Sequence, residues 1–225
     1  MNKIDRLKIS LRQYRAVVAL DAIRAQRQFQ AWQRAGRPIP PPQRFKQRVL
    51  IKVGAALSLR TLIETGTYMG DTVEVTRHHF DHVNSIEISA EIHRLAKIRF
   101  RDIANVRLFV GDSRSVLQQV LATLHEPALF WLDGHYSGPH TGGANVEAPI
   151  LDEIRQIAAH EYAPEHCILI DDARLFIGDR EYPSVDTLQA AATQLGFAHF
   201  ACGFDLIAMS ARPLSWPTLW DDASR

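Results

Sequence analysis

The segment from Glu64 to Gly70 combines an acidic residue with two glycines four positions apart, Gly66 and Gly70. Glycine has no Cβ and adopts positive φ readily, so a turn with two glycines lets its backbone approach a ligand closely. The order of apolar strand, acid, glycine turn and helix suits a nucleotide-like ligand, because a helix start offers free backbone N–H groups. This turn is therefore the first candidate site.

The spacing within the turn excludes two common nucleotide classes. Tyr68 stands where the G-x-G-x-x-G pattern of dinucleotide-binding proteins has its second glycine, which disfavours NAD. Gly70 is followed by Asp71 and Thr72, whereas a phosphate-binding P-loop needs Lys and Ser or Thr there. Glu64 would repel a phosphate but attracts an ammonium or sulfonium group. These observations favour S-adenosylmethionine.

Carboxylates recur after the predicted strands of the chain. A single carboxylate at such a position is often only a helix cap. Five successive strand ends that carry one are harder to explain by capping, and in a parallel sheet these ends lie along the same edge. The strand-end acids are Glu64, Glu87, Asp112, Asp133 and the pair Asp171-Asp172.

This pattern resembles the class I S-adenosylmethionine-dependent methyltransferases over residues 44–210. The stretch from Glu64 to Gly70 resembles the family's E/D-x-G-x-x-x-G motif, Glu87 its ribose-binding acid, and Asp112 its adenine-side acid. The resemblance implies that Glu64 stabilises the positive charges of the methionine part. The residues that it assigns to the cofactor are Glu64, Gly66, Thr67, Gly70, Glu87, Asp112, Ser113 and Asp133.

Asp133, Asp171 and Asp172 are three oxygen ligands of the kind that Mg²⁺ prefers. They are similar to the metal ligands of O-methyltransferases of the macrocin and catechol types, with Asp172 closer to the macrocin type. The resemblance thus implies a magnesium ion that Asp133, Asp171 and Asp172 bind. The other interpretation is that Asp133 contacts only the cofactor, whereas Asp171 and Asp172 cap a loop.

The residues after Asp133 are the candidates for acid-base chemistry. With a bound Mg²⁺ to lower the pKa of an acceptor hydroxyl, Asp133 is catalytic and His135 or Tyr136 is the general base. Either residue could equally pack against the cofactor. The glycine-rich loop at 137–146 is expected to contact the acceptor through His140 and Thr141, or to be an ordinary surface loop.

The predicted function is Mg²⁺-assisted O-methylation of a small hydroxylated acceptor, such as a sugar or glycoside. Two alternatives stay open. One is a metal-independent methyltransferase of the same fold. The other is a catalytically inactive cofactor-binding module whose N-terminal helix recruits a partner.

These residues require a sheet that brings the strand ends together. Apolar strand-like runs alternate with amphipathic helical segments, which predicts a Rossmann-like, mostly parallel twisted sheet with helices on both faces. We expect a closing hairpin around Gly203 and Phe204. The predicted strands are 61–65, 82–88, 106–110, 128–132, 167–170, 197–202 and 205–209, and the predicted helices are 71–79, 90–101, 115–124, 148–159 and 184–195.

The N-terminal segment differs from the rest of the chain in charge. Residues 1–52 hold 13 Lys and Arg against Asp5 and Asp21, a net charge of +11, whereas the remainder carries −10. Apolar residues in three-four spacing predict an amphipathic helix over 4–34, and a second helix is expected over 43–58. We predict that the first helix packs on the acidic part of its own chain or joins two copies into a homo-oligomer. An anionic membrane surface or a nucleic acid is a less favoured partner.

The prolines between Gly36 and Pro42 divide the chain into a basic extension, 1–42, and a methyltransferase domain, 43–225. A chain of 225 residues with 46% hydrophobic residues suffices for one core. The sequence contains no stretch of ~18 apolar residues, so we expect a cytoplasmic protein without a transmembrane segment. Cys167 and Cys202 are predicted to be buried free thiols.

Overall fold

One seven-stranded sheet forms the centre of this computed structural model, which describes residues 7, 11, 14–133, 149–179 and 182–225. The order across the sheet is β3-β2-β1-β4-β5-β7-β6. The first five strands pair in parallel, and β7 is antiparallel to both of its neighbours. The predicted fold class and the closing hairpin are therefore confirmed. The strands are β1 (Thr61–Thr65), β2 (His82–Glu87), β3 (Val106–Val110), β4 (Ala128–Leu132), β5 (Cys167–Ile170), β6 (His199–Gly203) and β7 (Leu206–Ser210).

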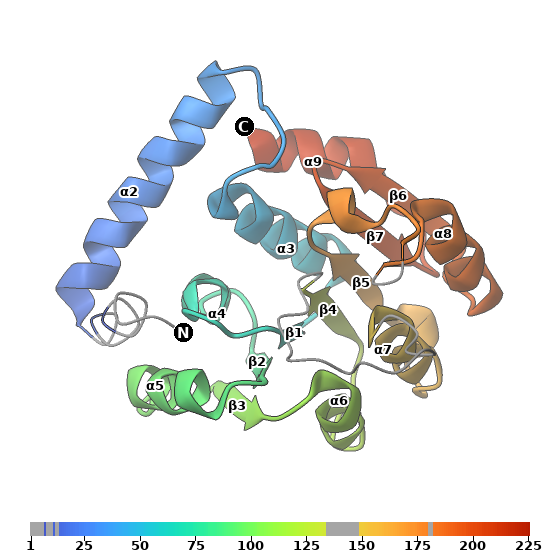
Figure 1. Cartoon of the computed structure of the whole chain (residues 1–225), viewed down its shortest axis with the longest axis horizontal. Coiled ribbons are helices and arrows are strands. Elements are labelled where there is room, and N and C mark those ends of the chain that lie inside the picture. Colours follow the sequence, from blue (N-terminus) through green and yellow to red (C-terminus); the bar gives the residue numbers. More distant parts are fainter. Residues whose placement is uncertain (1–6, 8–10, 12–13, 134–148, 180–181) are drawn as a thin grey trace.

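Helices cover both faces of this sheet (Figure 1). The helices are α2 (Arg15–Arg34), α3 (Gln43–Leu57), α4 (Asp71–Thr76), α5 (Ala90–Phe100), α6 (Ser113–Leu121), α7 (Pro149–Ala158), α8 (Val185–Gln194) and α9 (Trp216–Ser224), with short 3₁₀ turns η1 (Ala163–Glu165) and η2 (Ala173–Leu175). Successive strand residues point to opposite faces. Leu62 and Leu129 therefore contact the layer of α3, α4, α5 and α9, whereas Ile63 and Phe130 contact α6, α7 and α8.

Several helices differ from the sequence prediction. Helix α4 ends at Thr76, not at residue 79. Helix α6 begins at Ser113, not at residue 115, because the Asp112 carboxylate accepts a hydrogen bond from the Arg114 N–H and caps it. Helix α9 was not predicted. Its buried residues Trp216, Trp220 and Ala223 follow a helical spacing, and they pack against α3.

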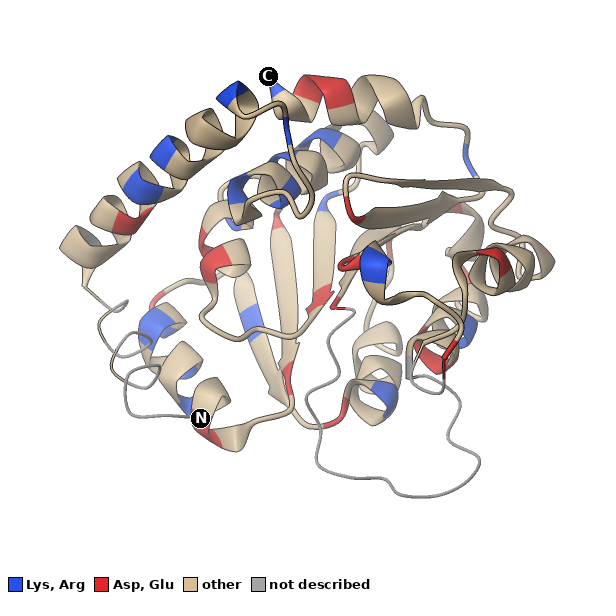
Figure 2. Cartoon of the chain, turned by 45° about the horizontal axis from the view of Figure 1, so that its top comes forward, with Lys and Arg blue, Asp and Glu red and all other residues tan. Residues whose placement is uncertain are grey.

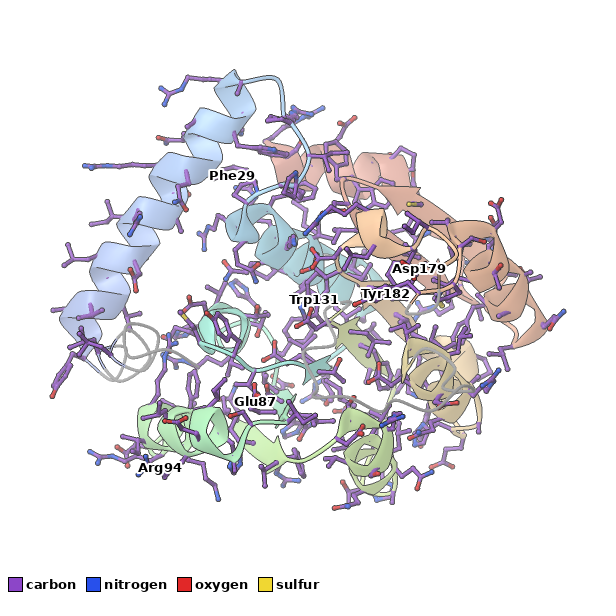
Figure 3. All side chains as sticks on the ribbon, in the orientation of Figure 1. Phe29, Glu87, Arg94, Trp131, Asp179 and Tyr182 are labelled. Atoms are coloured by element: carbon purple, nitrogen blue, oxygen red, sulfur yellow. The ribbon has the colours of Figure 1, made fainter. Side chains whose placement is uncertain are left out.

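The N-terminal helix α2 begins at Arg15, because Tyr14 adopts an extended backbone and separates it from the helical residues Leu7 and Leu11. Only the C-terminal end of α2 joins the core. Phe29 points toward α3 (Figure 3), and Phe29 and Trp32 are both buried there. The division at residue 42 stays a prediction.

Among the described residues, no helix has both the length and the apolar character needed to cross a bilayer. Cys167 is a buried free thiol, as predicted. The prediction for Cys202 was wrong, since this thiol is exposed. The physical reason is that β6 is an edge strand of the sheet, so part of its surface has no covering layer.

Candidate cofactor site

The glycine turn between β1 and α4 is held close to the sheet. Gly66 and Gly70 both have positive φ, 96° and 72°. The Gly66 N–H donates to the Ile86 carbonyl oxygen at 2.8 Å, which ties the turn to β2. A Cβ at Gly66 would lie 2.7 Å from Oδ2 of Asp133. The carboxylate after β4 therefore lies directly against the turn after β1, as the sequence predicted for strand ends that share an edge.

Glu64 is a buried carboxyl group at the end of β1. The Ser85 hydroxyl donates to Glu64 Oε1 at 2.6 Å, and Thr67 Oγ1 lies 2.5 Å from Ser85 Oγ. Burial raises the pKa of Glu64 to about 8, and the charges of Asp133 and Glu87 act in the same direction. A cation beside Glu64 would favour its ionised form, so the site has an electrostatic reason to bind one.

Glu87 ends β2 and is labelled in Figure 3. Backbone donors fix its carboxylate. The Tyr68 N–H donates to Oε2 and the Ser89 N–H to Oε1, each at 2.9 Å. A carboxylate has about four acceptor positions, so both oxygens keep capacity for a pair of hydroxyls. Tyr68 reaches this position with a φ of 42°. The turn and the predicted ribose-binding acid thus form one unit.

The predicted adenine-side residues Asp112 and Ser113 lie at the start of α6. Arg114 Nη2 lies 2.6 Å from Asp112 Oδ2, and this pairing lowers the pKa of Asp112. The Ser113 hydroxyl donates to Oε1 of Glu153 on α7. Burial raises the pKa of Glu153 to about 7. The start of α6 therefore brings one cation, Arg114, and one buried carboxyl group, Glu153, next to the two predicted residues.

No protein-family model and no curated protein sequence matches this chain. Solved structures do match it. An SAH-bound methyltransferase of Podospora anserina has a TM-score of 0.53 at 14% identity, over 75% of this chain and 78% of that one. A SAM-bound O-methyltransferase of Streptomyces achromogenes, involved in tomaymycin synthesis, gives 0.52 at 12%, over 84% and 89%. A SAM-bound amino pentose methyltransferase of Micromonospora echinaspora, involved in calicheamicin biosynthesis, gives 0.52 at 14%, over 74% and 90%.

The chain has the class I methyltransferase fold. Within this fold, Glu64, Gly66 and Glu87 lie together at the carboxyl ends of β1 and β2, with Asp133 beside them. These are positions that the resemblance assigns to the cofactor. Their individual roles stay predictions.

The expected magnesium ligands are arranged differently from the prediction. Asp171 and Asp172 follow β5, and Lys46 Nζ of α3 lies 2.5 Å from Asp171 Oδ1 and 3.4 Å from Asp172 Oδ1. Arg174 Nη1 lies 2.8 Å from the same Asp172 oxygen and also contacts Asp205. Cations of the chain itself thus neutralise the two carboxylates.

These residues do not fit a divalent ion as they stand. The described residues contain no group of three or more His, Cys, Asp or Glu side chains that could hold a metal. The magnesium prediction is therefore not supported. The physical reason is that the positive charges of Lys46 and Arg174 lie where the metal ion would bind, beside Asp171 and Asp172. Burial raises the pKa of Asp171 to about 6, and the ammonium of Lys46 opposes this rise.

The predicted general bases His135 and Tyr136, and the predicted acceptor contacts His140 and Thr141, lie outside the described residues. Sequence analysis missed Lys46 and Glu153. Glu153 had a signal, because it lies on the apolar face of α7 that Ile150, Ile154 and Ile157 form. Lys46 had the same kind of signal, because it lies three and four positions before Val49 and Leu50 on the buried face of α3, but it is one of many basic residues before residue 53.

Proposed function

We propose that this protein is an S-adenosylmethionine-dependent methyltransferase. One observation carries the proposal: the buried carboxyl group of Glu64 and the amide-bound carboxylate of Glu87 flank a glycine turn at the edge of the sheet. The glycine turn and the two acids fit a ligand that has a cationic amino acid part and a ribose. The fold that the chain shares with known methyltransferases supports this interpretation.

Each residue of this site has a defined task under the proposal. Gly66 allows the backbone to lie against the methionine part, because a side chain there would collide with Asp133. Glu64 faces the positive charges of the ligand in a region of low dielectric, where a charge pair is strong. Glu87 accepts hydrogen bonds from the ribose hydroxyls. Ser113 lies toward the adenine, and Glu153 orients its hydroxyl.

When bound, S-adenosylmethionine supplies an electrophilic methyl group on a positively charged sulfur. Held between the glycine turn and Glu87, the cofactor would supply this methyl group to an acceptor hydroxyl; its sulfur would be the leaving group, and a base of the protein would take the hydroxyl proton. The protein must hold the acceptor oxygen in line with the breaking bond and exclude water. His135 and Tyr136 remain the predicted bases.

The acceptor that we propose is a small hydroxylated molecule such as a sugar or glycoside. The structural neighbours include O-methyltransferases and an amino pentose methyltransferase, which supports a small acceptor. The magnesium-assisted form of this reaction requires Asp171 and Asp172 to leave Lys46. We therefore favour the metal-independent form that the sequence left open.

Calorimetric titration tests the cofactor assignment. The wild-type protein should bind S-adenosylmethionine and its demethylated product, and Glu87→Gln should weaken both by at least about tenfold, because a neutral amide loses charge-assisted hydrogen bonds. Glu91→Gln is the matched control, since Glu91 begins α5 near Glu87 but lies outside the proposed site. A wild-type protein that binds neither ligand would contradict the proposal.

Methyl transfer to a panel of hydroxylated acceptors separates the remaining possibilities. Turnover that persists in EDTA is expected for the proposed enzyme. Turnover that EDTA abolishes and Mg²⁺ restores would show the metal-assisted form. Cofactor binding without turnover on any acceptor is the outcome expected for an inactive binding module.

A further inference from the structure

Lys46 is a buried lysine whose side chain ends between two carboxylates. It belongs to α3, yet its contacts are Asp171 and Asp172, which follow β5 some 126 residues later in the chain. Only 7% of the residue is exposed. A buried ammonium group is costly unless carboxylates pair with it. Helix α3 thus delivers a cation to the edge where the strands of the sheet end.

The two carboxylates also require a cation. Asp172 is a buried residue with a left-handed backbone, φ 56°, and its N–H donates to Asp171 Oδ1 at 2.7 Å. The two side chains lie close to one another, where like charges repel, because the same Lys46 nitrogen is 2.5 Å from Asp171 Oδ1 and 3.4 Å from Asp172 Oδ1. Lys46 Nζ contacts one oxygen of each, and Arg174 contacts Asp172 from the other side. The ammonium is therefore the counter-charge that this arrangement is built around.

We propose that Lys46 is a built-in substitute for a divalent cation at Asp171 and Asp172. An ammonium at 2.5 Å from a carboxylate oxygen and a metal ion would need the same space and the same lone pairs. The wild-type protein therefore has no divalent-ion site at these carboxylates. The proposal deepens the proposed function by making it metal-independent, and in that respect alone it rests on that function.

Arg174 does not take over the position of Lys46. Its Nη1 bonds to Asp172 and to the fully buried carboxylate of Asp205, so it is committed to joining η2 to the turn before β7. Asp171, in contrast, has Lys46 as its cationic partner among the described residues. Removal of the ammonium leaves Asp171 as an uncompensated oxygen ligand next to Asp172.

A titration of the full chain with Mn²⁺ alone tests this proposal. Electron paramagnetic resonance measures the concentration of free Mn²⁺ at each step. The wild-type protein should leave the free Mn²⁺ signal unchanged, and its melting temperature should not respond to Mg²⁺ or Mn²⁺. Wild-type binding of Mn²⁺ that Asp171→Asn abolishes would overturn the proposal. This measurement needs no variant at Lys46, so a misfolded variant there leaves it decisive.

The variant Lys46→Met keeps the length of the side chain and removes its charge. We expect a lower melting temperature than that of the wild type, a loss of free Mn²⁺ signal, and a recovery of melting temperature when Mn²⁺ is added. Lys52→Met is the matched control on the same helix, and it should show none of these three effects. A folded Lys46→Met protein that binds no Mn²⁺ would overturn the proposal as well.

Cofactor binding is measured separately in the same samples. Binding of S-adenosylhomocysteine should be similar in wild type and Lys46→Met. The reason is that the glycine turn follows β1 and is bonded to β2, whereas Lys46 contacts the residues after β5. A wild-type protein that binds neither Mn²⁺ nor S-adenosylhomocysteine would contradict the proposed function while leaving the role of Lys46 intact. The two inferences can therefore fail independently.

Discussion

At the scale of single residues, Gly66 decides whether the turn after β1 can accept a ligand. Its φ is 96°, and a Cβ would lie 2.7 Å from the Asp133 carboxylate. Two penalties thus fall on any side chain at this position: backbone strain and a steric clash. The strain alone costs about 1–2 kcal/mol for a residue with a Cβ.

Gly66→Ala should therefore lose affinity for S-adenosylmethionine by more than tenfold, as measured by calorimetry. Gly196→Ala is the matched control, because Gly196 has a nearly equal φ of 94° but no atom within 4 Å of an added Cβ. Gly196→Ala should lower the melting temperature because of the backbone strain, and it should leave the affinity for S-adenosylmethionine unchanged. Equal affinity of the two variants would contradict the proposed position of the ligand.

The buried carboxyl group of Glu64 gives the site a predicted pH dependence. Its pKa of about 8 means that much of the free protein carries a proton there at pH 7. A cationic ligand favours the ionised form, so binding should release a proton, and affinity should rise with pH up to about 8 by at most about tenfold per unit.

Calorimetry in buffers of different ionisation enthalpy counts this proton. S-Adenosylmethionine and its demethylated product both carry an ammonium group, so the binding of either should release the Glu64 proton. Binding of adenosine should not release it. Glu64→Gln should bind S-adenosylmethionine without the Glu64 proton. Unchanged proton release in that variant would assign the proton to another group.

At the scale of elements, a pair of histidines joins helices to the amino ends of two strands. The Ala128 N–H at the start of β4 donates to His166 Nδ1 at 3.0 Å. His166 Nε2 lies 2.9 Å from His160 Nδ1, and His160 Nε2 lies 3.2 Å from the Leu124 carbonyl oxygen. His166 Nδ1 accepts the Ala128 N–H only while this nitrogen carries no proton, so protonation of Nδ1 would break the hydrogen bond to β4.

Acid should therefore weaken the fold through His166. Burial lowers the pKa of His166 to about 3, below its ordinary value of 6.5. Between these values the unfolded chain binds the proton and the folded chain does not, so stability is lost as pH falls from 6.5 toward 3, by at most about 1.4 kcal/mol per pH unit. Chemical denaturation at several pH values measures this slope.

His166→Asn should remove this contribution to the slope, because asparagine does not titrate. His125→Gln, which changes an exposed histidine close to the same region, should leave the slope as it is in the wild type. An identical slope in wild type and His166→Asn would show that other groups cause the acid sensitivity.

At the scale of the whole molecule, α2 carries basic residues along its length (Figure 2), although most of the chain's acidic residues lie in the body. Only the C-terminal end of α2 is packed in the core. The middle of α2 lines a cavity of about 620 Å³ together with residues of α3, α4 and α5. Leu20 and Ile23 of α2 are more than half exposed. Exposed apolar residues on a basic helix are typical of a surface that binds a partner.

We accordingly expect a homodimer that forms through α2, which is one of the two arrangements that the sequence predicted for this helix. Light scattering should give twice the mass of one chain. The double variant Leu20→Glu with Ile23→Glu should give the mass of a single chain, because it places charges in the apolar contact. A wild-type protein with the mass of one chain contradicts this expectation.

The sequence by itself determined the features that depend on neighbouring residues. Alternating apolar runs indicate the strands, and the glycines indicate the turn at Gly66. Ser89 and Ser184 cap α5 and α8, which is a local effect because each side chain accepts a bond from the start of the helix that it precedes. The meeting of Asp133 with Gly66 was predictable too, because parallel strands end along one edge. The unpredicted α9 had the required spacing but follows a short proline-containing stretch.

Only the tertiary structure decided how the charges pair. Lys46 reaches Asp171, and Glu153 reaches Ser113, across 125 and 40 positions of sequence, and such contacts depend on the rotation and distance of packed helices. A carboxylate at a strand end looks the same in sequence whether a metal ion or a lysine neutralises it. Packing determines which cation comes within bonding distance, and here α3 places an ammonium at the end of β5.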